Sequence, residues 1–299
     1  MKTNHEKMKE FIEGRKFTGK GTRMRFIPLP NDEVSVTCIS SKLDSSLELP
    51  DFVTGIGDPN FENSAFGIFS VTECYFEKIH LKGIKIYGNS IGGWLKGAPS
   101  VREVILEDID FGEVSDMMNM FSDLTYLKSV KFINCDTSHI TDMSEMFCDS
   151  NMLEEVDIRC FDTRNVVGTY EMFASCKGLK SLDLSHFDTS KVTDMESMFH
   201  SCINLRELDL RSFDTREVKT MSHMFSNCIR LEKLDISSFQ INSGVNVTGM
   251  FLDCMSIKDI KVRESYRDIL MSTNEMSDYD PNYSEYLKNY NPRVNVVMP

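Results

Sequence analysis

The sequence predicts an α/β solenoid of about eight coils, with a parallel β-sheet on one face and short helices on the other. A Met-Phe pair recurs every 26 residues, from Met120-Phe121 to Met250-Phe251. A fixed period of this length is typical of repeats that bury an apolar face only against their neighbours. Each period also contains an alternating strand-like segment and a segment with helical spacing. We therefore expect one elongated domain rather than several compact ones.

The strand of each coil is predicted from two neighbouring units, LKSLDLSHFDTSKVTDMESMF at residues 179–199 and LRELDLRSFDTREVKTMSHMF at residues 205–225. In Leu182-Asp183-Leu184 the alternation places the two leucines inside and the aspartate outside. Equivalent strands would stack in parallel and in register, about 4.8 Å apart. Phe187 would then point inward, and Asp188-Thr189 would form a polar turn whose side chains bond their own backbone.

The short helix of each coil is predicted from Thr193-Asp194-Met195-Glu196, which has the pattern of a capping box. Met195, Met198 and Phe199 follow at i, i+3 and i+4 and would line the buried side of that helix. Most methionines are thus expected in the core. A Met-rich binding groove, the alternative, would require these side chains to be exposed.

The repeat defines three segments of the chain. Residues 33–263 are predicted to form the solenoid. Residues 1–32 lack the period and are interpreted as an N-terminal cap or small irregular segment, with a separate functional domain as the alternative. Residues 264–299 also lose the period and are rich in tyrosine, which favours a C-terminal cap or tail. A docking or phosphorylation segment is the alternative there.

Four of the nine cysteines repeat with the same period, at Cys176, Cys202, Cys228 and Cys254. Stacked in register, they would extend over three steps of about 4.8 Å, whereas zinc needs all four sulfurs about 2.3 Å from one point. In-register neighbours would also be too far apart for a disulfide. We therefore predict small buried residues and no metal site. The odd number of cysteines likewise favours free thiols.

A family resemblance rests on two stretches. Residues 47–66, LELPDFVTGIGDPNFENSAF, resemble the BspA-type leucine-rich repeats, and the later LDLSxFDTSxVTDMxxMFxxC units resemble the mycoplasma surface-protein form of that group. Together the matches cover roughly residues 45–263. The resemblance implies a leucine-rich-repeat solenoid. It also implies adhesion or host interaction, because many BspA-like proteins are located on bacterial or protist surfaces.

The charge and the hydropathy of the sequence limit which partners and which cellular location are expected. The formal net charge of −13 argues against nucleic acid or an anionic membrane as a partner. No run of apolar residues is long enough to span a membrane. The start of the chain lacks the apolar core of a signal peptide, and no cysteine follows as a lipid anchor. We expect a cytoplasmic protein, or a surface or secreted one if a signal was trimmed.

No motif for catalysis stands out in the sequence. There is no Gly-rich phosphate loop, nucleophile elbow or paired-carboxylate signature, and the six histidines form no pair with ligand spacing. We therefore predict a protein that is not an enzyme, with no catalytic residues and no cofactor.

The outward side of the strands carries the remaining functional signal. Four aspartates occupy the central strand position, with a lysine beyond each end and arginines two residues after alternate aspartates. One interpretation is a polar position that keeps the sheet soluble, and the other is a recognition strip for a protein. The predicted partner-binding face comprises Glu155, Asp157, Arg159, Asp183, Glu207, Asp209, Arg211 and Asp235.

The first hypothesis is a non-enzymatic module that binds another protein through this face, for example as an intracellular inhibitor or effector. A surface adhesin that binds a host is an alternative, and so is a purely structural spacer. A further alternative is a nucleic-acid mimic that blocks a nuclease or polymerase channel. The interleaved basic residues weaken that last hypothesis, because a phosphate track carries one sign only. The identity of the partner and the oligomeric state stay open.

Overall fold

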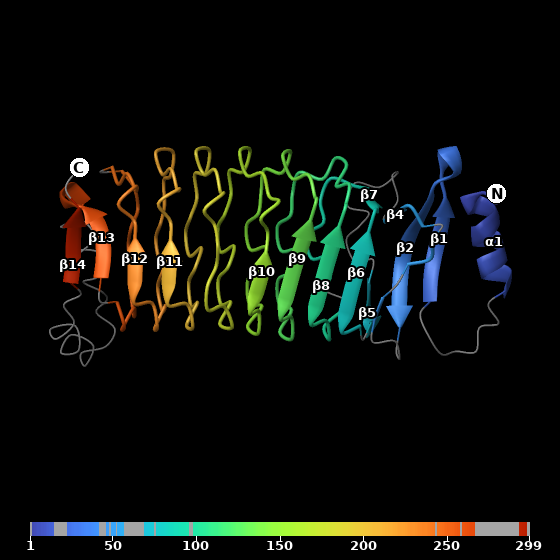
Figure 1. Ribbon diagram of the computed structural model, residues 1–299, viewed down its shortest axis with the longest axis horizontal. Coiled ribbons are helices and arrows are strands. Elements are labelled where there is room, and N and C mark those ends of the chain that lie inside the picture. The colour runs from blue at the N-terminus through green and yellow to red at the C-terminus, as the bar shows by residue number, and fades with distance from the viewer. Residues whose placement is uncertain are drawn as a thin grey trace.

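The computed structural model is a parallel β-solenoid whose coils stack side by side along the long axis of the molecule (Figure 1). The structure describes residues 2–14, 23–41, 46–47, 49–51, 53–56, 69–74, 76–95, 98–242, 244–257, 259–266 and 293–297. The predicted solenoid with a parallel sheet on one face is confirmed.

Two parallel sheets form the strand face of the solenoid, which we define as the outward side of β6 and of β8 to β13, including residues 181–183 between β10 and β11. The apolar positions stack in register, with Val104 beside Val130 in one sheet and Leu208 beside Leu234 in the other. In order, the first sheet contains β10 (Glu155–Asp157), β9 (Ser129–Ile133), β8 (Glu103–Glu107), β6 (Lys78–Lys82) and β3 (Ser46–Leu47). The second contains β11 (Glu207–Asp209), β12 (Lys233–Asp235), β13 (Asp259–Arg263) and β14 (Arg293–Val297).

The N-terminal residues lie at one end of the solenoid (Figure 1). Asp32 fixes α1 (Asn4–Gly14) there, because its carboxylate accepts hydrogen bonds from the backbone N–H groups of Asn4 and His5 at 2.7 and 3.0 Å. A 3₁₀ turn (Pro30–Asp32) joins the antiparallel strands β1 (Arg23–Pro28) and β2 (Val34–Ser41). Parallel to β2 run β4 (Gly55–Ile56) and β5 (Phe69–Cys74), and β4 pairs with β7 (Lys85–Ile86).

The C-terminal end adds a strand that the sequence period does not predict. After a 3₁₀ turn (Glu264–Tyr266), β14 pairs in parallel with β13, with Ile260 beside Val294. The final strand therefore covers the hydrogen-bonding edge of β13, which would otherwise be open to other chains. The tyrosines expected in a tail, Tyr279, Tyr283, Tyr286 and Tyr290, lie outside the described residues, as does part of the 47–66 stretch.

The face opposite the strands consists of tight turns, and the short helices expected there are absent from the continuous stretch 98–242. Ser197 has φ 54°, in the left-handed region, which an α-helix cannot contain. Asp194 accepts a hydrogen bond from the N–H of Glu196 at 2.9 Å, so it forms a local turn instead of a capping box. The turn from Met195 to Met198 closes at 3.3 Å. It orients both methionines inward, as a helix would, so the spacing alone could not separate the two structures.

Left-handed residues recur at one position of this turn, at Glu145, Glu171, Ser197 and His223. Glycine adopts this conformation without the steric cost that other residues incur. We therefore expect Ser197→Gly to stabilise the protein by about 0.5–1 kcal/mol in a urea titration. The matched control is Ser190→Gly, at a position outside the left-handed region, which should lose stability. Loss of stability in both variants would contradict the strain argument.

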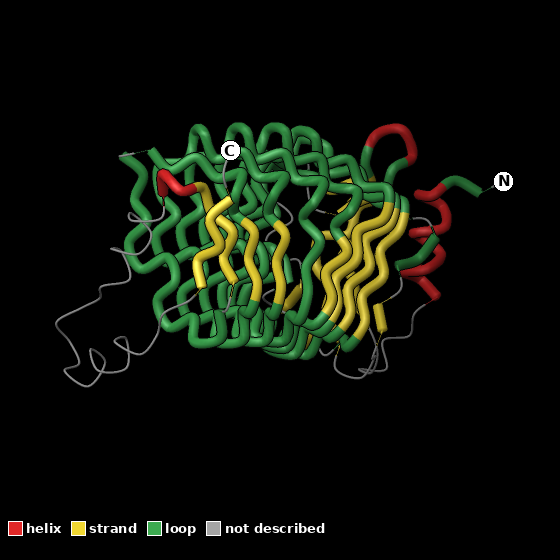
Figure 2. Tube along the Cα trace, turned by 60° about the vertical axis from the view of Figure 1, so that its left-hand side comes forward, coloured by secondary structure: helices red, strands yellow, loops and turns green. Residues whose placement is uncertain are grey.

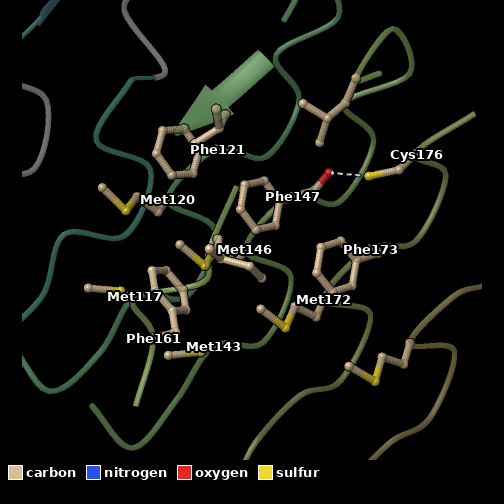
Figure 3. Packing of buried hydrophobic residues seen from close by; sticks show 14 of the residues in the cluster. Met117, Met120, Phe121, Met143, Met146, Phe147, Phe161, Met172, Phe173 and Cys176 are labelled. Carbon is tan, nitrogen blue, oxygen red and sulfur yellow. Dashed lines mark hydrogen bonds between the residues drawn. The ribbon is translucent and has the colours of Figure 1, made fainter. Parts of the chain in front are cut away.

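The core is a ladder of methionine and phenylalanine side chains from successive coils (Figure 3). The rings of Phe147 and Phe173 stack with centroids 5.3 Å apart, and those of Phe173 and Phe199 are 5.8 Å apart. Met146, Met172 and Met198 are fully buried beside them, which confirms core packing over an exposed methionine groove.

The repeating cysteines line the same core. Cys176 donates its S–H to the carbonyl oxygen of Phe147 at 3.2 Å, as Figure 3 shows, and Cys254 does the same to Phe225 at 2.9 Å. Both thiols are buried and free. The prediction that they are small residues filling a corner of the core is therefore confirmed.

A row of buried threonines joins the coils at the turn after the strand. Thr163 Oγ1 accepts the N–H of Asp188 at 2.8 Å and donates to its carbonyl oxygen at 2.9 Å. Thr189 bonds Asp214 in the same way at 2.8 and 2.9 Å. The sequence predicted that Asp188 and Thr189 would bond their own backbone. This is right for Asp188, which accepts from the N–H of Ser190, but Thr189 bonds the next coil instead.

Candidate functional site

The predicted partner-binding residues all lie on the strand face. Six of their side chains are exposed, and two, Asp157 and Asp235, are half-buried. Asp209 stands beside Asp235 and Asp235 beside Lys261 in the register of β11, β12 and β13, as the 26-residue spacing predicts. Lys131 stands beside Asp157 in the same way. The structure therefore brings these residues into rows that run along the solenoid axis.

Three of the four aspartates of this face are paired with cations. Arg159 contacts Asp157 at 2.8 Å and Arg211 contacts Asp209 at 2.5 Å, each two residues away in its own coil. Between coils, Lys261 reaches Asp235 at 3.4 Å. The strand face thus displays ordered charges of both signs. Ion pairs at a protein surface such as these add little to the stability of the fold.

Glu207 and Asp183 have different kinds of partner on this face. Lys233 binds Glu207 across the gap between β12 and β11 at 2.7 Å. Asp183 instead accepts hydrogen bonds from the side chain and the N–H of Ser185 at 2.7 and 3.0 Å. Its carboxylate is therefore held in place by neutral donors, and it is exposed to solvent.

These contacts keep the carboxylates ionised. The side-chain hydrogen bond from Arg211 lowers the pKa of Asp209 to about 2. The side-chain hydrogen bond from Arg159 likewise lowers the pKa of Asp157, and that from Ser185 lowers the pKa of Asp183. Because a carboxylate that accepts hydrogen bonds is favoured in its charged form, the face carries these negative charges throughout the neutral range.

The strand face is interrupted at one coil. Residues Ser181–Asp183 occupy a strand position but form no strand, and they separate β10 from β11. Within the stretch 98–242, no backbone hydrogen bond joins residues 181–183 to either neighbouring coil. Figure 2 shows two groups of strands with unpaired chain between them. The backbone polar groups of this coil are therefore available to water or to a partner.

A groove of about 440 Å³ lies on the strand face beside this interruption. Leu182, which is half-buried, and Leu208 supply apolar surface, while the rows described above supply the charges. The polar residues that line it include Ser181, Glu207, Asp209, Arg211, Lys233 and Asp235. The wall of the groove is formed by the interrupted coil and the three coils that follow it.

The charged face extends further than the predicted residues. Lys82 and His80 of β6 both contact Glu107 of β8, at 2.5 and 3.2 Å, and Lys78 contacts Glu103 at 2.8 Å. The hydrogen bond from Lys82 lowers the pKa of Glu107. The sequence signal for this region is weak, because its apolar residues are offset by one from the 26-residue period. The register confirms the offset, since Ile79 pairs with Val104, only 25 residues later.

The described part of the chain contains neither a metal-binding cluster nor a membrane-spanning helix. No group of three or more His, Cys, Asp or Glu side chains in these ranges could hold a metal ion. Among the same residues, no helix is both long enough and apolar enough to cross a bilayer.

Two solved structures are similar to this chain at low sequence identity. One is the crystal structure of a leucine rich cell surface protein from Faecalibacterium prausnitzii A2-165, with 14% identity, a TM-score of 0.27, and coverage of 88% of this chain and 95% of that one. The other is a chain from an octameric complex of Latrophilin 3, Unc5D and FLRT2, with 15% identity, a TM-score of 0.25, and coverage of 88% and 89%.

A protein-family model matches the repeats of this chain. No curated protein matches the sequence. The family model described as "Mycoplasma protein of unknown function, DUF285" matches residues 94–184 and 170–279. These segments contain the regular coils, and they agree with the resemblance to mycoplasma-type BspA repeats. Because the two matches together span more than half of the sequence, the chain belongs to this mycoplasma family of repeat proteins.

Proposed function

We propose that the protein is a non-enzymatic module that binds another protein through the strand face, with the groove beside Ser181–Asp183 at the centre of the contact. The observation that carries this proposal is the groove itself, whose walls combine apolar surface with ordered charges of both signs. Leucine-rich-repeat solenoids are typically binding scaffolds, and extended faces of this kind suit a long contact. The partner segment would be extended and of mixed charge, so that it complements the rows.

Unpaired backbone groups support the same location. Residues 181–183 form no backbone hydrogen bonds to either neighbouring coil within the stretch 98–242, so β10 and β11 are each paired on one side only. A partner segment lying along the groove could bond these groups directly. Main-chain hydrogen bonds would then contribute affinity, and the charged rows would contribute specificity.

The paired charges argue against mimicry of nucleic acid. A phosphate track presents one sign, whereas Asp157, Asp209 and Asp235 each contact a cation. Binding through mixed charges around an apolar groove should depend only moderately on salt. A steep loss of affinity with added salt would instead favour the mimic.

The double variant Asp183→Ser with Asp209→Ser tests this proposal. It removes Asp209, which lines the groove, and Asp183, which follows the groove residue Leu182. We expect the affinity for the partner to fall at least about tenfold, since charged hydrogen bonds contribute about 1.5–3 kcal/mol. The partner would first be obtained with the wild-type chain by affinity capture and identified by mass spectrometry. Its affinity would then be measured with purified proteins by calorimetry.

The matched control is Asp188→Ser with Asp214→Ser. These aspartates lie in the same two coils and also accept a hydrogen bond from the residue two positions on, at 2.9 and 3.1 Å. They belong to the turn after the strand and not to the strand face. Equal losses of affinity in the two double variants would refute a site on the strand face. Unchanged binding in the first variant would favour a spacer role.

A further inference from the structure

Two cysteines outside the proposed binding face contact each other across adjacent coils. Cys135, just after β9, is buried, and its Sγ lies 3.4 Å from the carbonyl oxygen of Ile133 and 3.6 Å from that of Leu106. Cys160, at the corresponding turn of the next coil, is half-buried. The Cys160 thiol interacts with the side chain and the backbone N–H of Cys135, and both thiols are free.

The position of Cys160 in its coil explains why its side chain reaches the preceding coil. In the coils that follow, the residues at this position are His186, Ser212 and Ser238. Each of them contacts a carbonyl oxygen 28 residues earlier in the chain. The pairs are His186 with Ile158 at 3.0 Å, Ser212 with Leu184 at 3.3 Å, and Ser238 with Leu210 at 3.2 Å. A side chain here therefore leans back towards the coil before it.

The partner position explains why a thiol pair forms at only one place in the regular coils. Cys135 stands where the later coils have Phe161, Phe187, Phe213 and Phe239. A phenylalanine offers nothing for a polar group to bond, so the side chain at the Cys160 position bonds a backbone carbonyl there. Opposite Cys135 it meets a thiol instead. In the continuous stretch 98–242, this is the one place where both positions are cysteine.

The contact differentiates the two thiols chemically. The hydrogen bond from Cys135, helped by N–H donors of Cys135 and Cys160, lowers the pKa of Cys160 to about 7. The same hydrogen bond, together with burial, raises the pKa of Cys135. Cys148 differs from Cys160, since burial and the surrounding acids raise the pKa of its thiol. Cys160 is thus the accessible nucleophile, and Cys135 is a buried thiol beside it.

We propose that Cys135 and Cys160 form a reversible dithiol–disulfide site that takes a small-molecule disulfide of the glutathione type as its oxidant. The Cys160 thiolate attacks one sulfur of glutathione disulfide, forms a mixed disulfide and releases one glutathione thiolate. Cys135 then loses its proton to solvent and attacks the Cys160 sulfur, which releases the second glutathione thiolate. The two cysteines lose two electrons in total, and glutathione disulfide gains them to give two glutathione molecules.

The resulting bond would fasten two neighbouring coils to each other at the end of the strand. The two side chains interact across adjacent coils, and a disulfide between them requires Cβ atoms about 3.5–4.5 Å apart. In the repeating row, Cys176 and its equivalents are wholly buried and bond carbonyl oxygens, so they should not react. The site is independent of the strand-face proposal, because neither cysteine lines the groove.

The test incubates the full-length chain in glutathione buffers of increasing oxidised fraction, traps free thiols by alkylation after acid denaturation, and reads the intact mass. We expect the oxidised wild type to carry two labels fewer than its nine cysteines allow. After digestion with trypsin, the peptide of residues 160–164 should be disulfide-linked to the peptide of residues 132–159. Fragmentation of this pair should place the bond at Cys135 rather than at Cys148. Reduction with dithiothreitol should restore all nine labels.

Two variants distinguish the roles of the thiols. Cys160→Ser introduces the residue that two later coils have at this position, and it should leave Cys135 fully alkylated. Cys135→Ala should stop the reaction at the mixed disulfide, so the protein keeps one glutathione on Cys160. If a variant does not fold, the peptide map of the wild type still decides. A bond between other cysteines, or nine labels in the most oxidising buffer, would overturn the proposal.

Discussion

Replacing Phe173 by alanine is expected to lower the free energy of unfolding by about 3–5 kcal/mol, the largest loss for any single change proposed for this chain. The ring is fully buried and stacks on Phe147 on one side and on Phe199 on the other, with centroids 5.3 and 5.8 Å away. Truncation therefore opens a cavity between three coils. Urea unfolding followed by circular dichroism gives the measurement.

The control for this change is Val167→Ala in the same coil. Val167 is 42% exposed, and its truncation should change the stability by no more than about 0.5 kcal/mol. A solenoid depends on its nearest-neighbour interfaces, so damage in a central coil affects the coils on both sides. A loss below about 1 kcal/mol for Phe173→Ala would mean that the stacked rings do not hold the coils together.

Thr163→Val is expected to lower the free energy of unfolding by about 2–4 kcal/mol. The change leaves one buried donor and one buried acceptor without a partner, and each such group costs about 1–3 kcal/mol. Thr163 is 3% exposed and holds both the N–H and the carbonyl oxygen of Asp188 in the next coil. Valine has nearly the same shape, so packing is preserved and the hydrogen bonds alone are removed. Thermal and urea unfolding would measure the loss.

Thr141→Val provides the comparison. Thr141 is exposed, and its hydroxyl group donates to the carbonyl oxygen of Ser115 at 3.1 Å, where water can replace it. The next coil already has valine, Val167, at this position. The change should therefore be neutral within about 0.5 kcal/mol. Similar losses for the two threonines would show that burial of the bonded groups is not what matters.

The inward and outward pattern of the coils could be read from the sequence. A period of 26 residues places equivalent residues side by side, so Val130 meets Val156 and Leu208 meets Leu234. The candidate binding residues reach the strand face for the same reason. Burial of the Met-Phe pairs and of the Cys176 row follows from this repetition, because each coil covers the apolar side of its neighbour.

The turns opposite the sheet could not be predicted in this way. A helix and a tight turn both bring residues i and i+3 to one side, so Met195 and Met198 fit either structure. The left-handed backbone of Ser197 decides between them, and serine gives no local signal for it. The strand β14 is also invisible to the period, because it pairs with β13 across a long segment without repeats.

The amino-acid pattern is enough to establish the solenoid: which side chains face inward, which strands adjoin, and which charges line one face. How closely neighbouring coils meet depends on the packing of the folded chain. Leu182 and Leu208 have the same local pattern, yet only the second lies in a paired strand. Cys135 and Cys160 meet although they are one residue out of register. Both outcomes depend on distances between coils, which result from the packing of the whole stack and from no single repeat.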